Sequence, residues 1–433
     1  MIVHAGEVPT EEGFAQTLDQ TDPLAGFRDE FVLPLGEDGL PLVYFLGNSL
    51  GPMPKAARAL VEEELDNWAK LAIDAHFRAR VPWVDYQEAV KEGMGRVVGA
   101  HPNEVVAMNT LTVNIHFMLA SFYQPTARRF KIVMEDRAFP SDRYAVASQL
   151  RLRGIDPSSA IVVAKPRTGE STIRTDDLLD LIRDQGDALA LVFLGGVNYN
   201  TGQFFDLSAI AEAGRNTGAV VGYDLAHAAG NVPLALHDWG VDFAVWCTYK
   251  YMNAGPGSIA GAFVHSRHGN DPAVPRLAGW WGHEADTRFV MGPSFVPERG
   301  AEGWQVSNPP ILSLAPLRAA LEQFDRAGMT ALRSKSESLT GYLAALLAAI
   351  PSNPLRQLTP DDPAARGCQL SLHYPGRGQW LHDRLRTEGI VGDYREPDIF
   401  RVAPAPLFNT HHEVWRAAAA IRRAVTTDGA GGA

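Results

Sequence analysis

Residues 218–224 read GAVVGYD and residues 241–250 read VDFAVWCTYK, and these two apolar runs decide the fold. The first run ends at Asp224 and the second at Lys250, so a carboxylate and an amine each close a predicted strand. Adjacent strands of an α/β sheet place their carboxyl ends beside one crevice. A lysine and an acid there suit pyridoxal phosphate (PLP), whose aldehyde needs an amine and whose ring nitrogen needs a carboxylate. A surface lysine and a helix-capping aspartate are the alternative that this spacing leaves open.

The composition is that of an ordinary globular protein, with 46% hydrophobic and 21% charged residues among 433. A net charge of −11 argues against nucleic acid or an anionic membrane as a partner, because both need a basic face. The longest apolar runs, such as 189–194, are too short to span a bilayer, and we see no signal peptide. Cys247 and Cys368 give no disulfide framework, so we expect a reduced, cytoplasmic protein.

Strand and helix patterns alternate from about residue 90 to 265. The predicted strands are apolar on both faces, which indicates a mostly parallel, seven-stranded sheet covered by helices on both sides. They span residues 105–108, 131–134, 160–163, 189–194, 219–223, 243–246 and 261–264. The predicted class is therefore α/β.

Changes in composition along the sequence predict four segments. Residues 1–48 form an irregular N-terminal arm that contributes to a small domain, and residues 49–312 form the large, cofactor-binding domain. Residues 313–427 form the small α+β domain, because strand and helix patterns resume after a loop rich in proline and acidic residues. Residues 428–433, DGAGGA, are predicted to be a disordered tail.

Two strand-to-helix segments carry polar residues that could hold a ligand. Thr110, Leu111 and Thr112 open a predicted helix, where backbone N–H groups and a hydroxyl suit a phosphate. Residues 139–142, FPSD, supply an aromatic ring and a carboxylate after the next strand. His227 lies at a predicted helix start, three residues beyond Asp224. Taken alone, each of these could equally be a cap, a turn or a structural histidine.

Arg401 stands among apolar residues in a predicted strand of the small domain. A buried charge needs a partner. That partner could be an internal acid, or it could be the carboxylate of a substrate held by both arms of the guanidinium group. The histidine pairs His265/His268 and His411/His412 lack a third ligand at metal spacing, so we expect no metal site.

Several longer motifs resemble one family. They are YFLGNSLG (44–51), Pro82-Trp83, NTLTVNIH (109–116), FPSD (139–142), DLAHAAGNVP (224–233), HDWGVDFAVWCTYKYMNAGPG (237–257), GWWGH (279–283), SNPPI (307–311) and RVAP (401–404). From about residue 43 to 405 the chain resembles kynureninase, a PLP-dependent hydrolase with the aspartate-aminotransferase fold (fold type I). Other enzymes of that fold share the aspartate and the lysine, but not the residues around them.

The resemblance implies a set of cofactor contacts. Lys250 would bind the PLP aldehyde as an imine, and Asp224 would pair with the ring nitrogen. The further implied contacts are Leu111, Thr112 and Tyr249 at the phosphate, Phe139 on the ring, and Ser141, Asp142 and His227 nearby. One position departs from the family, because Gly195 stands where many members have a serine that contacts the cofactor.

The resemblance also implies how the substrate is held. Arg401 would bind its carboxylate, His76 and Asn308 would line the pocket for its aryl ring, and Ser49 would lie near that pocket. Trp280 and Asn308 would reach the site from the other subunit, so the family implies a homodimer. The polar groups of His76 and Asn308 favour a hydroxylated aryl ring.

The implied reaction is hydrolysis of L-kynurenine or 3-hydroxy-L-kynurenine to anthranilate or 3-hydroxyanthranilate and L-alanine. Lys250 would be the base and Tyr249 would relay a proton. The alternatives are a further substituted 3-hydroxykynurenine as substrate, another fold-type-I enzyme such as an aminotransferase or cysteine desulfurase, or a non-catalytic sensor. Tryptophan catabolism by the kynurenine pathway, NAD biosynthesis and secondary metabolism all use this step, and the sequence does not distinguish them.

Overall fold

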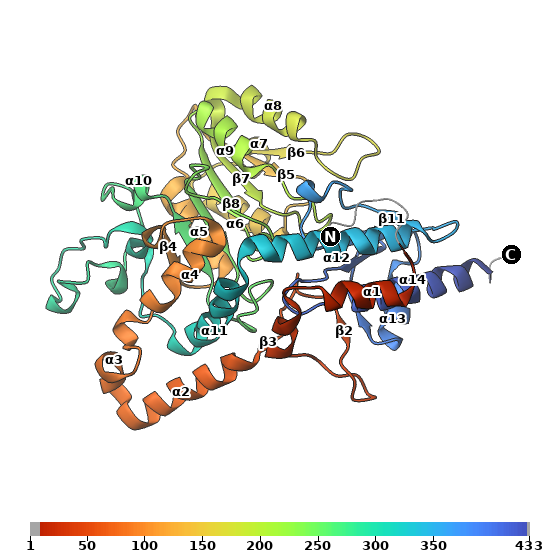
Figure 1. The fold of residues 1–433 in the computed structure, drawn as a ribbon. Coiled ribbons are helices and arrows are strands. Elements are labelled where there is room, and N and C mark those ends of the chain that lie inside the picture. Colours follow the sequence, from red (N-terminus) through yellow and green to blue (C-terminus); the bar gives the residue numbers. More distant parts are fainter. Residues whose placement is uncertain (1–8, 431–433) are drawn as a thin grey trace.

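The computed structural model describes residues 9–430, and its centre is a seven-stranded sheet (Figure 1). The strand order is β4-β10-β9-β8-β7-β5-β6, in which β10 runs antiparallel to both neighbours and the other pairs are parallel. All seven predicted strands are confirmed. They are β4 (Val105–Ala107), β5 (Lys131–Glu135), β6 (Ile161–Ala164), β7 (Leu189–Gly195), β8 (Val220–Asp224), β9 (Phe243–Trp246) and β10 (Gly261–Val264).

Each face of this sheet packs against its own apolar layer, because side chains alternate along a strand. On β7, Leu191 and Phe193 enter the layer formed with α5 (Leu111–Phe122) and α6 (Pro140–Leu152). Val192 and Leu194 enter the opposite layer. The helices of that second layer are α4 (Glu88–Val98), α8 (Thr175–Gln185), α9 (Leu207–Asn216) and α11 (Ile311–Ala327).

Two glycines in the sheet make room for aromatic rings on β9. Gly222 of β8 lies directly opposite Phe243, and Gly261 of β10 lies directly opposite Trp246. A Cβ atom on Gly222 would approach the Phe243 ring to 2.1 Å, and one on Gly261 would approach the Trp246 ring to 2.2 Å. The aromatic rings of β9, the strand that precedes Lys250, therefore pack closely against the backbone of both neighbouring strands.

A second core lies in the C-terminal part of the chain, around a four-stranded antiparallel sheet with the order β11-β12-β15-β14. The N-terminal segment joins it, because β2 pairs with β13 and α1 contributes Ala15 and Leu18. The elements are α1 (Glu12–Gln20), β2 (Val43–Tyr44), α12 (Met329–Ala348), β11 (Arg356–Gln357), β12 (Leu370–His373), α13 (Gly378–Thr387), β13 (Ile390–Val391), β14 (Asp393–Arg395), β15 (Ile399–Val402) and α14 (His411–Ala430).

The described part of the chain departs from two local predictions. His227 lies in a turn after β8 and not at the start of a helix. Helix α14 runs through 428–430, which were predicted to belong to the tail, and 431–433 lie outside the described residues. The domain limits remain predictions. Residues of α11, and Leu332 at the start of α12, pack in the core of the large sheet. From Leu339 onward, α12 packs in the second core.

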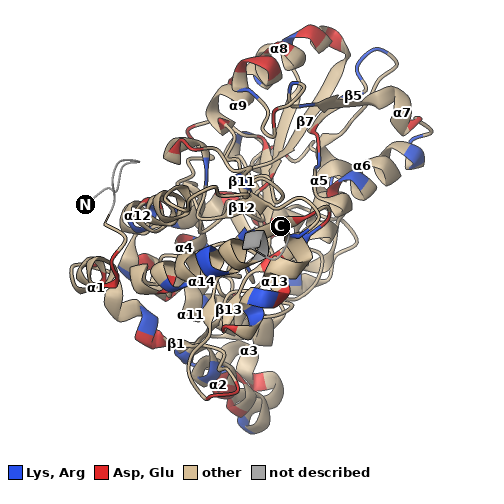
Figure 2. Cartoon of the chain, turned by 90° about the vertical axis from the view of Figure 1, so that its right-hand side faces the viewer, with Lys and Arg blue, Asp and Glu red and all other residues tan. Residues whose placement is uncertain are grey.

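The outer helices carry charges of both signs, as Figure 2 shows along α13. Many are paired one turn apart, such as Lys70 with Asp66 on α2 (Lys55–Leu71) at 2.7 Å and Arg384 with Glu388 at 3.0 Å. Among residues 9–430, no helix combines the length and apolarity of a membrane span. The remaining elements are β1 (Phe31–Val32), β3 (Met53–Pro54), α3 (Ala75–Arg78), α7 (Pro157–Ala160), α10 (Ser266–Gly269) and several short 3-10 helices.

Replacing Gly222 by alanine tests the packing around β9. The new methyl group would overlap the Phe243 ring, so we expect Gly222→Ala to lower the free energy of unfolding by about 1–3 kcal/mol. Urea denaturation of the purified protein measures this loss. The matched control is Gly13→Ala in α1, where a Cβ meets no atom within 4 Å and should be neutral or slightly stabilising. Equal urea midpoints for Gly222→Ala and the wild type would contradict the packing argument.

Candidate active site

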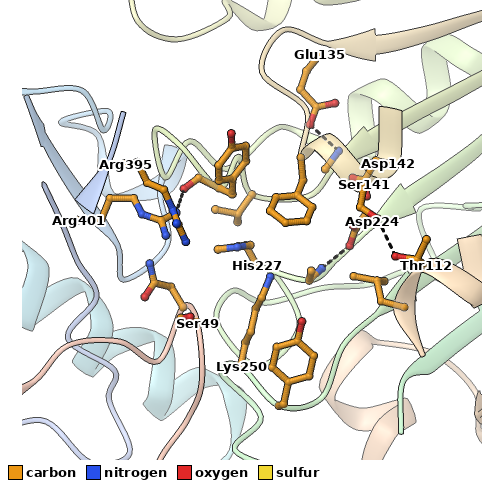
Figure 3. A pocket seen from close by; sticks show the side chains of 18 of the residues that line it. Ser49, Thr112, Glu135, Ser141, Asp142, Asp224, His227, Lys250, Arg395 and Arg401 are labelled. Atoms are coloured by element: carbon orange, nitrogen blue, oxygen red, sulfur yellow. Dashed lines mark hydrogen bonds between the residues drawn. The ribbon is translucent and has the colours of Figure 1, made fainter. Parts of the chain in front are cut away.

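A cavity of about 350 Å³ opens at the carboxyl ends of β5, β7 and β8. It lies between the two cores, because both the large sheet and the C-terminal sheet contribute to its wall (Figure 3). It is lined by Asn48, Ser49, Thr110, Leu111, Thr112, Glu135, Phe139, Ser141, Asp142, Gly195, Val197, Tyr199, Asp224, Ala226, His227, Tyr249, Lys250, Arg395 and Arg401.

Lys250 and Asp224 meet at this cavity, as their positions after neighbouring strands predict. Both are buried, with 9% and 5% of their surface exposed. One carboxylate oxygen of Asp224 accepts the backbone N–H of Ala226 at 2.7 Å. Burial raises the pKa of Asp224, and the positive charge of Lys250 opposes that rise. The Lys250 ammonium also lies 5.7 Å from the centre of the Phe139 ring. The predicted lysine, acid and aromatic ring are thus brought together.

Asp142 and His227 each present a buried polar atom that no described residue satisfies, Oδ1 of Asp142 and Nδ1 of His227. Burial, with the negative charges of Asp224 and Glu135, raises the pKa of Asp142 well above its ordinary value. Burial and the charge of Lys250 lower the pKa of His227 well below its ordinary value, so this imidazole is neutral near pH 7. An unpaired buried polar atom is costly, which indicates that a bound molecule supplies the missing partners.

The N-terminus of α5 provides an anion site on another wall of the cavity. Thr110 precedes the helix but its side chain makes no capping hydrogen bond. The first N–H groups of a helix have no acceptor within that helix, and they lie at the positive end of its dipole. The hydroxyls of Thr112 and Ser141 lie 2.8 Å apart beside them. Burial raises the pKa of Tyr249, so its phenol keeps its proton and can donate to an anion.

These groups together fit PLP. The helix terminus and hydroxyls suit a phosphate, Phe139 suits an aromatic ring, Asp224 suits a ring nitrogen and Lys250 suits an aldehyde. The unpaired atoms of Asp142 and His227 add polar contacts at the ring. The described residues therefore meet each functional group of this cofactor with a chemically matched side chain.

Arg401 lies at the opposite end of the cavity from Thr112 and Ser141 (Figure 3). It is 1% exposed, and its Nε donates to Asp393 at 2.7 Å. One terminal nitrogen donates to the same carboxylate and the other donates to the Tyr199 carbonyl. Arg395 pairs with the same carboxylate at 3.1 Å and is half exposed. The single carboxylate of Asp393 thus pairs with two guanidinium groups. This end of the cavity therefore has a net positive charge that can attract an anionic ligand.

Three predicted residues lie outside the cavity of this chain. His76 belongs to α3, on an arm formed by α2 and α3 that extends from the body of the molecule (Figure 1), and its Nδ1 lies 3.1 Å from the Ile73 carbonyl. The Trp280 indole donates to the Arg288 carbonyl at 3.0 Å, and Asn308 is exposed. The described chain does not bring these three residues to its own cavity, so their roles stay predictions.

Sequence reasoning missed four polar residues of the cavity wall, Asn48, Glu135, Tyr199 and Arg395, and the apolar Val197 and Ala226. The signal for Glu135 was present, because this acid ends β5 just as Asp224 ends β8. We expected no metal site from the sequence. The structure brings together His101, Glu104 and His237, whose possible ligand atoms lie within 4.8 Å of one another. Backbone N–H groups of His101 and Ser266, together with His237, already bind the Glu104 carboxylate, so we interpret the cluster as structural.

Breaking the Arg401 ion pair should destabilise the protein. Asp393→Ala leaves a buried guanidinium without its carboxylate, and we expect a loss of about 3 kcal/mol in the free energy of unfolding. The control is Asp383→Ala, which removes an ion pair with His382 from a side chain that is 65% exposed and should change stability by less than about 0.5 kcal/mol. Urea denaturation compares them. If the two variants unfold at the same urea concentration, Asp393 does not stabilise buried Arg401.

Known proteins resemble this chain in sequence and in fold. A model of the kynureninase C-terminal domain matches residues 332–421, and a model of class-V aminotransferases matches residues 43–374. The kynureninase of Myxococcus xanthus is 56% identical over 94% of this chain and 95% of its own length. That of Xanthomonas campestris pv. campestris is 53% identical, over 95% and 99%.

Solved structures share the fold at low identity. A cysteine desulfurase from Escherichia coli superposes with a TM-score of 0.75 at 19% identity, covering 93% of this chain and 98% of that one. A cysteine desulfurase from Thermococcus onnurineus gives 0.72 at 15% identity, covering 98% and 100%. These structures support the fold alone, whereas the sequence relatives extend over almost the whole length. The chain belongs to the kynureninase family.

Proposed function

We propose that this protein uses PLP to hydrolyse the Cβ–Cγ bond of L-kynurenine, of 3-hydroxy-L-kynurenine or of both, yielding anthranilate or 3-hydroxyanthranilate and L-alanine. The observation that carries this proposal is the meeting of Lys250 and Asp224 at one buried cavity. The relatives support the choice of reaction, since a protein named kynureninase matches 94% of the chain.

Some residues of the cavity bind the cofactor, and others transfer protons. PLP, when bound, supplies an aldehyde for the substrate amine and an electron sink for the carbon that loses its proton. Thr112, Ser141 and the N–H groups of α5 hold its phosphate, and ionised Asp224 holds its ring nitrogen. The Lys250 amine, once free, lies within the cavity as the base for the α-proton. Tyr249, which keeps its phenolic proton, is the proposed relay.

Arg401 and Arg395 bind the substrate carboxylate at the far end of the cavity. Their shared partner Asp393 neutralises one of the two positive charges, so an α-carboxylate meets a net attraction there. A substrate held there would have its amine toward Lys250, which lines the same cavity. His76 and Asn308 are the proposed aryl contacts.

A desulfurase reaction fits this site poorly. Such chemistry needs an accessible thiolate, because the thiolate is the nucleophile. Cys247 is 3% exposed and Cys368 is 0% exposed. Burial raises the pKa of Cys247 and raises that of Cys368 to about 12. An aminotransferase is the second candidate, and it would consume a keto acid that a hydrolase does not need.

A homodimer is part of the proposal. The arm surface, which we define as Leu65, Trp68, Ile73, Phe77, Phe289, Val290 and Met291, exposes between 43% and 74% of each side chain. Phe77 and Phe289 are in ring contact at 6.4 Å, and Phe289 also meets Trp280 at 5.7 Å. Exposed apolar patches of this kind mark protein interfaces.

We also infer a cytoplasmic protein acting in tryptophan catabolism or NAD biosynthesis.

Replacing Lys250 tests the proposed chemistry. Lys250→Ala removes the amine that binds the aldehyde and takes the α-proton, so we expect turnover of kynurenine to fall by at least about 10²-fold while the protein stays folded. The fluorescence of the anthranilate product reports turnover, and circular dichroism reports folding. Lys165→Ala, at an exposed lysine after β6 and away from the arm, is the control and should keep wild-type turnover. Wild-type activity in Lys250→Ala would refute the assignment.

Introducing a charge on the arm surface tests the homodimer. Phe289 is 54% exposed, and Phe289→Asp would bury an unpaired carboxylate if a second chain covers it. We expect light scattering to show monomers for this variant and dimers for the wild type, with loss of kynurenine turnover. Leu40→Asp, at a position 64% exposed outside the arm surface, should stay dimeric. A Phe289→Asp protein of unchanged mass would show that the arm surface is not the interface.

A further inference from the structure

Glu135 is a cavity residue with no role in the mechanism above. It ends β5, next to β7, and lines the same cavity as Asp224 (Figure 3). Only 2% of its surface is exposed. Its Oε1 accepts the backbone N–H of Gly195 at 3.1 Å, whereas Oε2 has no hydrogen-bond partner among the described residues. A buried acid with one unpaired oxygen at a binding cavity indicates a functional constraint, since such atoms are costly.

Gly195 makes this position of the carboxyl group possible. A Cβ atom on Gly195 would lie 2.9 Å from Oε1 of Glu135, closer than such atoms approach. Gly195 ends β7 and pairs in register with Asp224 of β8. The Glu135 carboxyl therefore occupies the space that a side chain at position 195 would need, between the ends of β5 and β8.

Three carboxyl groups now share one cavity wall. The titratable groups that act on Glu135 and its neighbours are Asp142 from α6, Asp224 from β8 and Lys250 after β9. His227 is neutral near pH 7, so Lys250 is the cation that acts on both aspartates. Three ionised acids against one ammonium would repel one another strongly in a buried site. At least one acid must therefore hold a proton.

Of the three carboxyl groups, Glu135 and Asp142 are the two whose surroundings favour the protonated form. Burial, assisted by the charge of Asp224, raises the pKa of Glu135 to about 7. Glu135 in turn raises the pKa of Asp142 when it is ionised. Asp224 differs from both, because Lys250 and the Ala226 N–H stabilise its negative charge. The proton on Glu135 is the one that leaves near neutral pH.

We propose that Glu135 is a positioning residue that sets the total negative charge of the cavity wall it shares with Asp142 and Asp224. With its proton it leaves the negative charge of the cluster on Asp224, the carboxylate that faces the ring nitrogen. Without its proton it adds a second negative charge to this wall and strengthens the hold on a positively charged ring. This inference rests on the proposed PLP site and deepens it, because it makes the basicity of the bound ring depend on a residue that does not react.

The proton on Glu135 can be observed directly in the full-length chain. Infrared spectra of the wild type minus Glu135→Gln isolate the carbonyl stretch of this one protonated carboxyl group. Without PLP we expect that band to fade as the pH rises through about 7, and loading PLP should lower the midpoint, because a positive ring favours the ionised acid. The Glu135→Gln variant keeps a carbonyl oxygen as acceptor for the Gly195 N–H, so the fold is not at risk from a lost hydrogen bond. No titrating band between pH 5 and 9 would overturn the proposal.

The visible absorption of the PLP-loaded protein tests the effect on the ring. A nearby negative charge stabilises protonated forms, so we expect Glu135→Gln to lower the apparent pKa of the absorption change by about one unit. The matched control is Glu302→Gln, which removes a buried acid paired with Lys91 outside the cavity and should leave the absorption titration unchanged. Superimposed titrations for wild type and Glu135→Gln would overturn this inference while leaving the proposed function intact. A wild-type chain that binds no PLP would overturn both.

Discussion

Asp224 ends β8 and Lys250 follows β9, so opposite charges meet where two neighbouring parallel strands stop. Both side chains are withdrawn from water, which makes their attraction stronger and any unpaired charge beside them more costly. The two apolar layers and the glycine–aromatic contacts of β9 hold these strand ends in place. The chemistry of the cavity thus depends on the same packing that stabilises the sheet.

The cavity has two ends with different side chains, and each core supplies one of them. The large sheet and α5 offer a phosphate site, an aromatic ring and a cluster of acids. The C-terminal sheet offers Arg401 and Arg395, and Arg401 also donates to the Tyr199 carbonyl, which follows β7 of the large sheet. A substrate that spans both ends would therefore bind both cores. Arg401 can be buried there because Asp393 pairs with its guanidinium group.

Much of the fold could be predicted because its signals are local. Seven apolar runs became the seven strands, and polar residues just after them became the cavity wall. Glu135 could have been found, because it ends β5 as Asp224 ends β8, but no lysine follows a neighbouring motif to draw attention to it. Arg395 was missed because the pairing of β14 with β15 brings it beside Arg401, and the cluster was missed because His237 is distant in sequence from His101 and Glu104. His76, Trp280 and Asn308 were predicted from the resemblance alone, and the described chain does not bring them to its own cavity.

The most direct test of the account is to locate the bound cofactor chemically. Borohydride reduction of the PLP-loaded protein fixes the aldehyde carbon to the amine that holds it, and peptide mapping by mass spectrometry then identifies the residue. The account predicts the added mass on the peptide that contains Lys250, and a marked decrease in that labelling for Asp224→Ala, which no longer holds the ring nitrogen. Labelling of a different lysine, or no labelling at all, would contradict it.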